Sequence, residues 1–333
     1  MKYHSFPGTD LFVSQLCFGC WGITSDFHWG QRAEVESVDA MLAAVDAGVN
    51  FFDTAPMYGE GASETLLGKV VAENNLRDKL VIASKIRPDK MRPSDVVADC
   101  EESLARLQTD YLDLYQTHWT SPDVPIADTW GAMRELQTQG KVRHIGVCNA
   151  GVGDMGDLLP LQKPLTNQLP YNLIARMIEF EVQPRCVDEG IGILVYSPLM
   201  HGMLADKYKT AAEVPDGRAR SRHFTTDRPK ARHGEPGCEA ETFAALDRIR
   251  AIAASVESSM AELALAWTIA KPGIVSIIAG ARNADQARQN SGFLERTFPT
   301  ETIDQLDQAT EELKNALGSN PDLWDGGDNS RYR

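Results

Sequence analysis

Apolar runs alternate with helix-like stretches from one end of the chain to the other. Each run is five to nine residues long, and the residues between runs repeat their apolar positions at helical spacing. This alternation is typical of repeated βα units and a parallel sheet. We therefore predict eight strands, at residues 16–20, 50–55, 80–86, 111–119, 143–149, 165–171, 192–198 and 274–280.

The stretches between the runs have ordinary helix ends. Predicted helices at 34–47 and 126–139 each end before a glycine, and one at 93–107 begins with a proline. No Pro/Gly-rich linker divides the chain, so we expect residues 1–333 to form a single domain. Eight strands with crossover helices predict an α/β fold, a (β/α)8 TIM barrel, with function at the C-terminal ends of the strands.

Two segments extend this plan. A long loop at 199–238 follows the seventh predicted strand and holds many Lys and Arg residues against few acids. It forms either a solvated face or a loop that folds over the site to meet phosphate. A further helix is predicted at 300–317, and the polar C-terminal tail at 319–333 either caps the barrel or lies free.

Composition narrows the range of partners. The formal net charge of −14 argues against nucleic acid or an anionic membrane surface, because both attract positive fields. The first residues lack the apolar region of a signal peptide, and no stretch approaches the length of a membrane span. Six scattered cysteines fit reduced thiols. We expect a soluble, cytoplasmic protein that acts on a small molecule.

Two short motifs have competing interpretations. Cys17 and Cys20 form a C-x-x-C, but no second pair stands at the spacing that zinc requires, so we expect apolar strand residues and no metal site. Residues 151–156 read G-x-G-x-x-G after a strand, as in a Rossmann fold. That strand is the fifth, and no acidic residue ends an adjacent strand about twenty residues on, so we interpret the segment as a flexible βα loop.

Polar residues stand at the ends of neighbouring predicted strands. Asp53 ends the second strand after two phenylalanines, and a buried carboxylate needs a cation or donors. Lys85 ends the third strand, His118 ends the fourth, and Tyr58 follows Asp53 in its loop. Parallel strands bring such ends to one barrel mouth. We predict that Lys85 pairs with Asp53 and directs its charge at Tyr58.

This cluster suggests chemistry on a carbonyl group. A tyrosine hydroxyl titrates near pH ~10 in water, and an adjacent ammonium is expected to lower that pKa. Tyr58 could then act as the general acid that protonates a carbonyl oxygen as it becomes an alkoxide. His118 would donate a hydrogen bond to the same oxygen and polarise the carbonyl.

With these residues the chain resembles the aldo-keto reductase superfamily over nearly its whole length. "FFDTAPMYGEGASETLLG" is similar to the family's D-T-A-x-x-Y-G stretch followed by S-E-x-x-L-G, and "SKI", "YLDLYQTHW" and "GKVRHIGVCNAG" match three further segments. The resemblance implies a catalytic tetrad of Asp53, Tyr58, Lys85 and His118. It also implies reduction of aldehydes or ketones by a nicotinamide cofactor without a Rossmann domain.

The cofactor implied is NADPH or NADP rather than NAD. The resemblance assigns Gln168 and Asn149 to the carboxamide, Tyr196 to stacking on the nicotinamide, and Arg282 to the 2′-phosphate, for which a guanidinium fork is well suited. Gln286 and Asn290 would reach the adenine. The full implied set is Cys20, Trp21, Asp53, Cys148, Asn149, Gln168, Tyr196, Ser197, Leu199, Gly202, Lys207, Gly280, Arg282, Gln286 and Asn290.

The chain departs from the family pattern at three positions. Cys148 stands where serine is usual, Ala150 where an aromatic residue is common, and Ala279 where proline is frequent. A thiol donates weakly, so the carboxamide would be held less firmly on that side. The substrate pocket implied by the resemblance is apolar and lined by Trp29, Met57 and Trp119.

Three other functions remain open at this point. A barrel hydrolase could pair Asp53 with Glu60 or Glu64, but it would leave Lys85 and Tyr58 without roles. A sensor subunit could bind NADPH and turn over very slowly. A sugar or secondary-alcohol dehydrogenase would run in the oxidative direction, with Tyr58 as the base.

Overall fold

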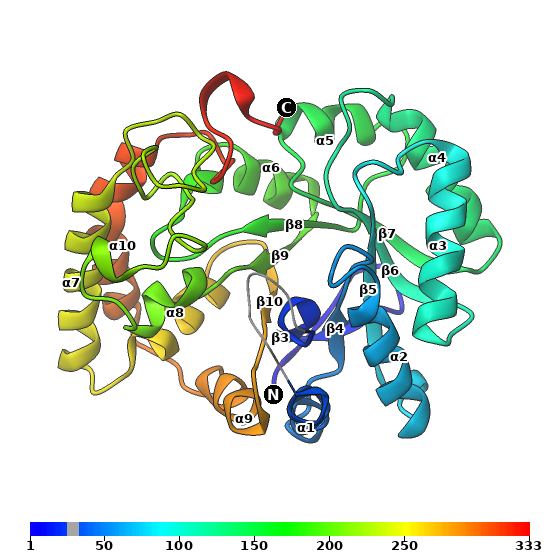
Figure 1. The fold of residues 1–333 in the computed structure, drawn as a ribbon, viewed down its shortest axis with the longest axis horizontal. Coiled ribbons are helices and arrows are strands. Elements are labelled where there is room, and N and C mark those ends of the chain that lie inside the picture. The colour runs from blue at the N-terminus through cyan, green and yellow to red at the C-terminus, as the bar shows by residue number, and fades with distance from the viewer. Residues whose placement is uncertain (25–32) are drawn as a thin grey trace.

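A closed barrel of eight parallel strands forms the centre of the computed structural model, which describes residues 1–24 and 33–333 (Figure 1). The strand order is β10-β3-β4-β5-β6-β7-β8-β9, so strands from the two ends of the chain pair with each other. The predicted fold class is confirmed. The barrel strands are β3 (Leu16–Gly19), β4 (Phe51–Asp53), β5 (Val81–Ile86), β6 (Leu112–Thr117), β7 (Val142–Cys148), β8 (Thr166–Pro170), β9 (Gly192–Tyr196) and β10 (Ile274–Ala279).

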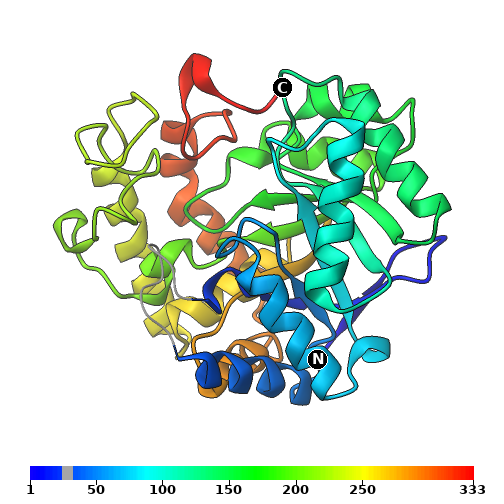
Figure 2. The ribbon, with the colours of Figure 1, turned by 45° about the vertical axis from the view of Figure 1, so that its right-hand side comes forward.

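Helices surround the strands and bury their apolar faces on the barrel (Figures 1 and 2). In α3, for example, Val96, Cys100, Leu104 and Leu107 are buried on one side, as helical spacing requires. The helices are α1 (Glu34–Asp46), α2 (Ala62–Glu73), α3 (Pro93–Leu107), α4 (Ile126–Thr138), α5 (Val152–Leu158), α6 (Val182–Glu189), α7 (Glu239–Ser255), α8 (Met260–Ile269), α9 (Ala284–Phe293) and α10 (Thr300–Leu317).

Each predicted strand coincides with one barrel strand, and the differences lie at the ends. The strand predicted at 16–20 stops at Gly19, because the chain turns into a 3-10 helix, η1 (Cys20–Gly22). The strand predicted at 111–119 stops at Thr117, and His118 already belongs to the loop. The predicted helices at 93–107 and 300–317 have the observed bounds.

A hairpin that the sequence analysis did not predict packs at the amino-terminal end of the barrel. Strands β1 (Tyr3–Ser5) and β2 (Phe12–Ser14) pair in antiparallel fashion. Leu11 and Val13 are buried in one cluster with Phe51 from inside the barrel. Three-residue strands are too short to show an alternating pattern, which explains why the hairpin was missed.

The loop at 199–238 and the tail at 319–333 pack on each other. The loop contains two 3-10 helices, η4 (Met200–Ala205) and η5 (Ala211–Glu213), and the tail contains η6 (Gly327–Asn329). Arg222 of the loop donates to the carbonyl oxygens of Leu317 (2.5 Å) and Asn320 (2.8 Å). The tail, red in Figures 1 and 2, therefore continues over the barrel and does not lie free.

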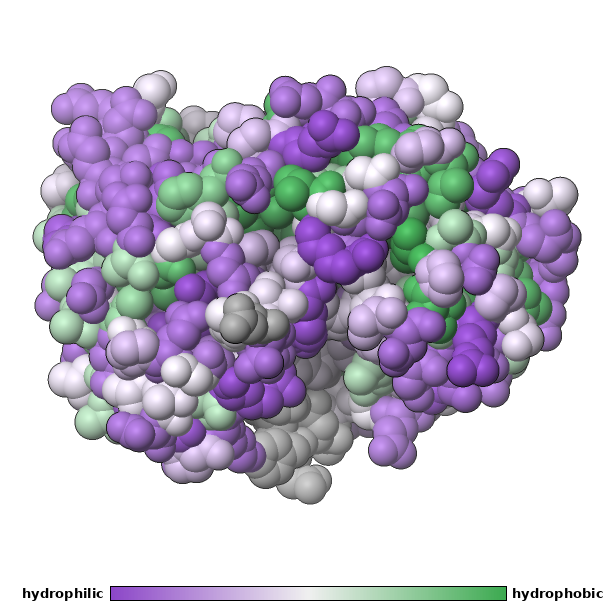
Figure 3. All heavy atoms as spheres, turned by 90° about the horizontal axis from the view of Figure 1, so that it is seen from above, coloured by the Kyte–Doolittle hydropathy of each residue, from purple (hydrophilic) through white to green (hydrophobic). Residues whose placement is uncertain are grey.

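Within the described part of the chain, none of the helices combines the length and apolarity that crossing a membrane requires. The face seen from above is largely hydrophilic, with hydrophobic residues exposed in strips between the polar ones (Figure 3). Helix α10 illustrates the division, because Leu306, Leu313 and Leu317 are buried while most of its acidic residues face outward.

Candidate active site

Four polar side chains from consecutive βα units meet at the carboxyl-terminal edge of the barrel. The Nζ atom of Lys85, in β5, lies 2.6 Å from Oδ1 of Asp53 and 2.9 Å from the carbonyl oxygen of Thr54. The same nitrogen lies 3.1 Å from the hydroxyl oxygen of Tyr58. Both Lys85 and Asp53 are buried. Lys85 is therefore the partner of Asp53, as predicted, and the Lys85 ammonium also reaches Tyr58.

The second oxygen of the Asp53 carboxylate is also occupied. Oδ2 accepts a hydrogen bond of 2.8 Å from Nε2 of Gln168, in the middle of β8 on the far side of the barrel. A buried ion pair is stable when further hydrogen bonds satisfy its remaining lone pairs, and Gln168 supplies one. The carboxylate thus ties the Lys85 ammonium to the opposite wall of the barrel mouth.

Burial changes the acidity of Tyr58 more than the neighbouring ammonium does. The sequence predicted that the Lys85 ammonium lowers the pKa of Tyr58, and the ammonium does act in that direction, but the net shift is upward. Burial raises the pKa of Tyr58 to about 12, and the opposing effect of the Lys85 charge offsets only part of that rise. The hydroxyl consequently keeps its proton throughout the neutral range.

The surroundings of Lys85 and His118 shift their pKa values in opposite directions. Burial disfavours the ammonium, yet the charge and hydrogen bond of Asp53, together with Tyr58 and Cys148, outweigh it, and the net effect raises the pKa of Lys85. Burial, assisted by the Lys85 charge, lowers the pKa of His118 well below its usual value. His118 is therefore neutral and Lys85 is charged at neutral pH.

The His118 ring faces Tyr58 at the barrel mouth. The two rings lie edge to face, with centroids 5.9 Å apart and an interplanar angle of 83°. The Nδ1 atom of His118 is buried and has no hydrogen-bond partner among the described residues. A neutral imidazole next to a phenol provides two donors for one oxygen atom placed between them.

The carboxylates of the alternative hydrolase site are arranged differently. Glu64 is buried in α2, and its two oxygens accept from Ser84 Oγ (2.5 Å) and Arg106 Nε (2.6 Å). Glu60 is exposed in the loop before α2. Glu64 thus fixes α2 to its neighbours, so the geometry gives Asp53 no paired carboxylate of the kind that hydrolysis needs.

The residues predicted for the nicotinamide end surround this cluster. Tyr196, at the end of β9, donates from its hydroxyl to Oδ1 of Asn149 at 2.8 Å, and Asn149 donates from Nδ2 to the carbonyl oxygen of His118 at 3.0 Å. The Trp21 ring lies 6.1 Å from the Tyr58 ring. Cys148 is buried, and burial raises the pKa of its thiol, as it does for Cys20.

The residues predicted for the phosphates and adenine lie along the loop after β9 and around the start of α9. Lys207 belongs to that loop, and a Cβ on Gly202 would stand 2.8 Å from its Cδ. Gln286 accepts from the backbone of Arg282 (2.9 Å), and Asn290 donates to the carbonyl oxygen of Gly280 (3.2 Å). Ser197 has a positive φ of 54°, and Leu199 lies just before η4.

A basic cluster forms where these two segments meet. Burial lowers the pKa of Lys207, and the charges of Arg282 and Arg218 lower it further. Both guanidinium charges therefore act on the Lys207 ammonium. Arg218 was not among the predicted site residues, although it belongs to the basic loop at 199–238 that could meet phosphate.

The residues predicted to line the substrate pocket lie in different surroundings. Met57 precedes Tyr58 and is 52% exposed. The Trp119 ring packs against the tail, with Arg331 above it and Tyr332 at its edge. Trp29 lies outside the described residues. The sequence left open whether the tail caps the barrel or lies free, and it did not identify these contacts.

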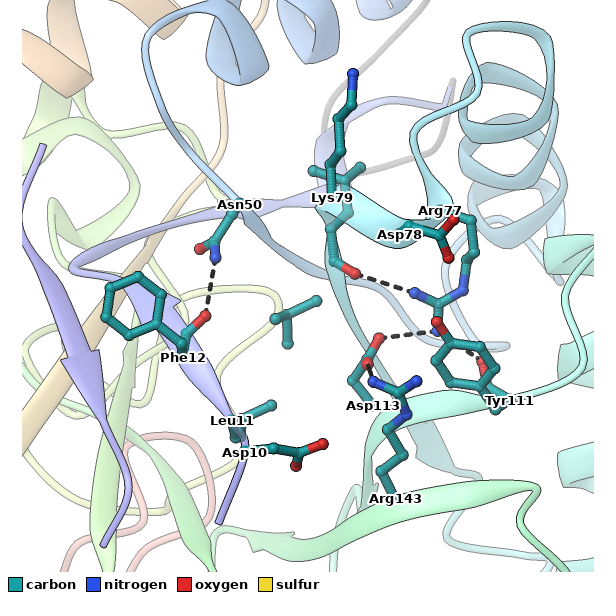
Figure 4. Close-up of a pocket in the computed structure, with 12 residues that line it drawn as sticks. Asp10, Leu11, Phe12, Asn50, Arg77, Asp78, Lys79, Tyr111, Asp113 and Arg143 are labelled. Atoms are coloured by element: carbon teal, nitrogen blue, oxygen red, sulfur yellow. Dashed lines mark hydrogen bonds and ion pairs between the residues drawn. The ribbon is translucent and has the colours of Figure 1, made fainter.

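A cavity of about 210 Å³ lies at the opposite end of the barrel (Figure 4). It is lined where β4 to β7 begin, far from the strand ends that hold the tetrad. Arg77 and Arg143 both pair with Asp113, at 2.9 and 3.3 Å, and both stack on Tyr111. The two guanidinium groups share the one Asp113 carboxylate, and these contacts join the starts of β6 and β7 to the segment before β5.

Neither cysteine nor acidic residues form a metal centre in residues 1–24 and 33–333, where no group of three or more His, Cys, Asp or Glu side chains could hold an ion. Cys17 and Cys20, the C-x-x-C pair, are buried free thiols. They pack as small apolar residues around the first barrel strand.

Comparison with known proteins shows which family this chain resembles in sequence. A sequence model of the Aldo/keto reductase family matches residues 15–311. Aldo-keto reductase YhdN of Bacillus subtilis (strain 168) is 33% identical over 299 residues, 86% of this chain and 86% of that protein. The NADH-specific methylglyoxal reductase of Escherichia coli (strain K12) is 29% identical over 316 residues, 88% of this chain and 94% of that protein.

Solved structures share the barrel. The crystal structure of an aldo-keto reductase from Klebsiella pneumoniae in complex with NADPH has a TM-score of 0.69 and 29% identity, covering 89% of this chain and 91% of that one. A glycerol dehydrogenase from Gluconobacter oxydans has a TM-score of 0.80 and 26% identity, covering 93% and 95%. The family match at 15–311 includes the four strand-end residues and stops before the tail.

Proposed function

The chain belongs to the aldo/keto reductase family, a family of oxidoreductases, and we propose that it reduces an aldehyde or ketone to the alcohol with NADPH. The observation that most supports the proposal is the position of one buried nitrogen. Nζ of Lys85 lies 2.6 Å from the Asp53 carboxylate and 3.1 Å from the Tyr58 hydroxyl. With this arrangement the Lys85 ammonium can stabilise the anion that Tyr58 becomes when it donates its proton.

The residues at the barrel mouth have the chemistry that an NADPH site requires. The amides of Asn149 and Gln168 can bind a carboxamide, and the Tyr196 ring offers a face for a planar ring. Lys207 and Arg282 provide positive charge for phosphate in a protein whose overall charge is negative. When bound, NADPH supplies the hydride that adds to the carbonyl carbon.

Tyr58 is the proposed proton donor. Its O–H bond breaks as the carbonyl oxygen accepts the proton, so the substrate gains a hydride at carbon and a proton at oxygen. The Lys85 ammonium stabilises the phenolate that remains, and Asp53 holds the ammonium in place. A pKa of about 12 keeps Tyr58 protonated at neutral pH yet leaves it more acidic than an alcohol.

His118 is proposed to polarise the carbonyl. Because its pKa is lowered well below the usual value, it is neutral and donates one N–H without adding positive charge beside Lys85. A second donor at the developing oxyanion stabilises the transition state more than the ground state.

We favour NADPH over NADH because of the basic cluster. The charges of Arg218 and Arg282 both act on Lys207, and positive charge gathered in this way suits a 2′-phosphate. One relative is named NADH-specific, so cofactor choice varies among similar chains and requires direct comparison.

The same residues serve the reverse reaction. In the oxidative direction Tyr58 accepts the alcohol proton as a base, and one similar structure is named a glycerol dehydrogenase. A slow NADPH-binding sensor would have the same binding residues without turnover. Measured rates in both directions separate these three roles.

Tyr58→Phe tests the proposal, since it removes the proton donor and leaves the ring. We expect carbonyl reduction to fall roughly 100-fold or more, while the NADPH dissociation constant changes by about twofold at most, because the hydroxyl is not among the groups proposed to hold the cofactor. Tyr111→Phe, at the other end of the barrel, is the matched control. Turnover retained by Tyr58→Phe would remove Tyr58 from its assigned role.

A further inference from the structure

The tail, residues 319–333, lies across the barrel mouth beside the candidate active site. In Figures 1 and 2 it runs from the end of α10, past the loop at 199–238, to the start of α5. Trp324 stacks parallel to Tyr196, with ring centroids 6.0 Å apart and an interplanar angle of 10°. Arg331 lies 3.5 Å above the centre of the Trp119 ring. The tail therefore contacts two residues predicted to bind cofactor and substrate.

The end of the tail rests on the glycine-rich loop whose function the sequence left unexplained. The carbonyl oxygen of Arg333 accepts hydrogen bonds from the backbone of Gly153 (2.7 Å) and Asp154 (3.3 Å). A Cβ on Gly151 would overlap that oxygen, and a Cβ on Gly153 would stand 2.7 Å from the Arg333 carbonyl carbon. These two glycines allow close approach of the chain's own backbone, and no phosphate is needed to explain them.

Buried ionic contacts hold the tail in this position. Asp154 is buried and accepts from Nε of Arg333 at 2.8 Å. Asp322, also buried, accepts two hydrogen bonds of 2.8 Å from the guanidinium of Arg331. Leu323 is completely buried. The Arg333–Asp154 contact ties the end of the tail to α5, while the Arg331–Asp322 contact lies within the tail and fixes its fold.

Tyr332 connects the tail to the residue assigned to the nicotinamide carboxamide. Its hydroxyl donates to Oδ1 of Asn149 at 2.9 Å, and the Tyr196 hydroxyl donates to the same oxygen at 2.8 Å. An amide oxygen has two acceptor positions, so both are taken. Nδ2 of Asn149 gives one hydrogen to the carbonyl oxygen of His118. Among the residues that the structure describes, the second N–H of Asn149 has no acceptor and is available to a ligand.

Gln168 offers a hydrogen-bond acceptor, where Asn149 offers a donor. Its Nε2 donates to Asp53, while the same amide keeps an oxygen that can accept. The two amides that face a carboxamide are therefore complementary: Asn149 offers an N–H to its oxygen, and Gln168 offers an oxygen to its NH2 group.

We propose that Tyr332 is a positioning residue that fixes the Asn149 amide for the nicotinamide carboxamide, docked there by Gly151 and Gly153. This inference rests on the proposed NADPH function. It assigns a role to the G-x-G segment, and it explains how a site with Cys148 in place of a stronger donor can still orient the carboxamide.

The test is Tyr332→Phe in the full chain, with NADPH and 2′,5′-ADP as separate probes. 2′,5′-ADP lacks the nicotinamide, so its binding reports only the adenosine end. We expect NADPH to bind about 2- to 10-fold more weakly, the effect of one hydrogen bond, and 2′,5′-ADP to bind unchanged. Tyr3→Phe is the matched control, because it removes a hydroxyl that donates to Gly48 at the far end of the barrel.

Two other results would overturn the inference. Unchanged NADPH binding would mean that Tyr332 is only a structural contact, and tighter binding would mean that the tail competes with the cofactor. If Tyr332→Phe fails to fold, Gly153→Ala displaces residue 333 without altering a tail side chain and should weaken NADPH alone. Failure of the parent chain to bind NADPH would instead overturn the proposed function itself.

Discussion

Removing the Lys85 ammonium should destabilise the whole fold, because it leaves the Asp53 carboxylate buried without a cation. Lys85 is fully buried and Asp53 is 2% exposed, so water cannot replace the lost charge. Breaking a buried pair on one side costs about 3–5 kcal/mol. For a chain of this size, Lys85→Met should therefore lower the melting temperature by roughly 4–7 °C.

The assay is thermal unfolding followed by circular dichroism, with Lys79→Met as the control because Lys79 is exposed. The double variant Asp53→Asn with Lys85→Met removes both charges and should recover most of the loss, since replacing a buried pair is often nearly neutral. A Lys85→Met chain as stable as the Lys79→Met chain would refute the view that this pair is screened from water. So would a double variant less stable than Lys85→Met alone.

Two further predictions concern the cofactor and pH. Arg282→Ala should weaken NADPH roughly 10- to 100-fold, the effect of losing a charge-assisted hydrogen bond, and NADH far less; equal weakening in titrations would contradict the 2′-phosphate assignment. Burial lowers the pKa of His223 from 6.5 to about 4, so its neutral form is favoured in the folded chain. Stability should be full above pH ~6.5 and fall by about 3 kcal/mol towards pH 4. In urea unfolding, the free energy of unfolding of His223→Gln should fall less between pH 6.5 and pH 4 than that of the parent chain. An equal fall in both chains would disprove the role of His223.

The barrel and the cluster at its mouth were predictable because both depend on local patterns. Strand ends in a parallel barrel share one edge, so Asp53, Lys85 and His118 could be brought together from their positions in the apolar runs alone. The sign of the Tyr58 pKa shift was not predictable. It depends on how completely the surrounding loops exclude water, and sequence spacing contains no measure of that.

The contacts of the tail could not be predicted from the sequence for a different reason. Tyr332 and Asn149 lie 183 residues apart, and no periodicity links a polar segment to the barrel mouth. The G-x-G loop did attract notice, but its glycines fit a backbone as well as they fit a phosphate. Only the structure distinguishes the two, by placing Arg333 against Gly151 and Gly153.

The central claim is tested most directly by titrating the purified chain with NADPH and with NADH, then following NADPH consumption over a panel of aldehydes, ketones and sugars. The account predicts tighter binding of NADPH than of NADH and turnover with at least one carbonyl compound. Binding without turnover would favour the sensor role, and the absence of NADPH binding would contradict the account.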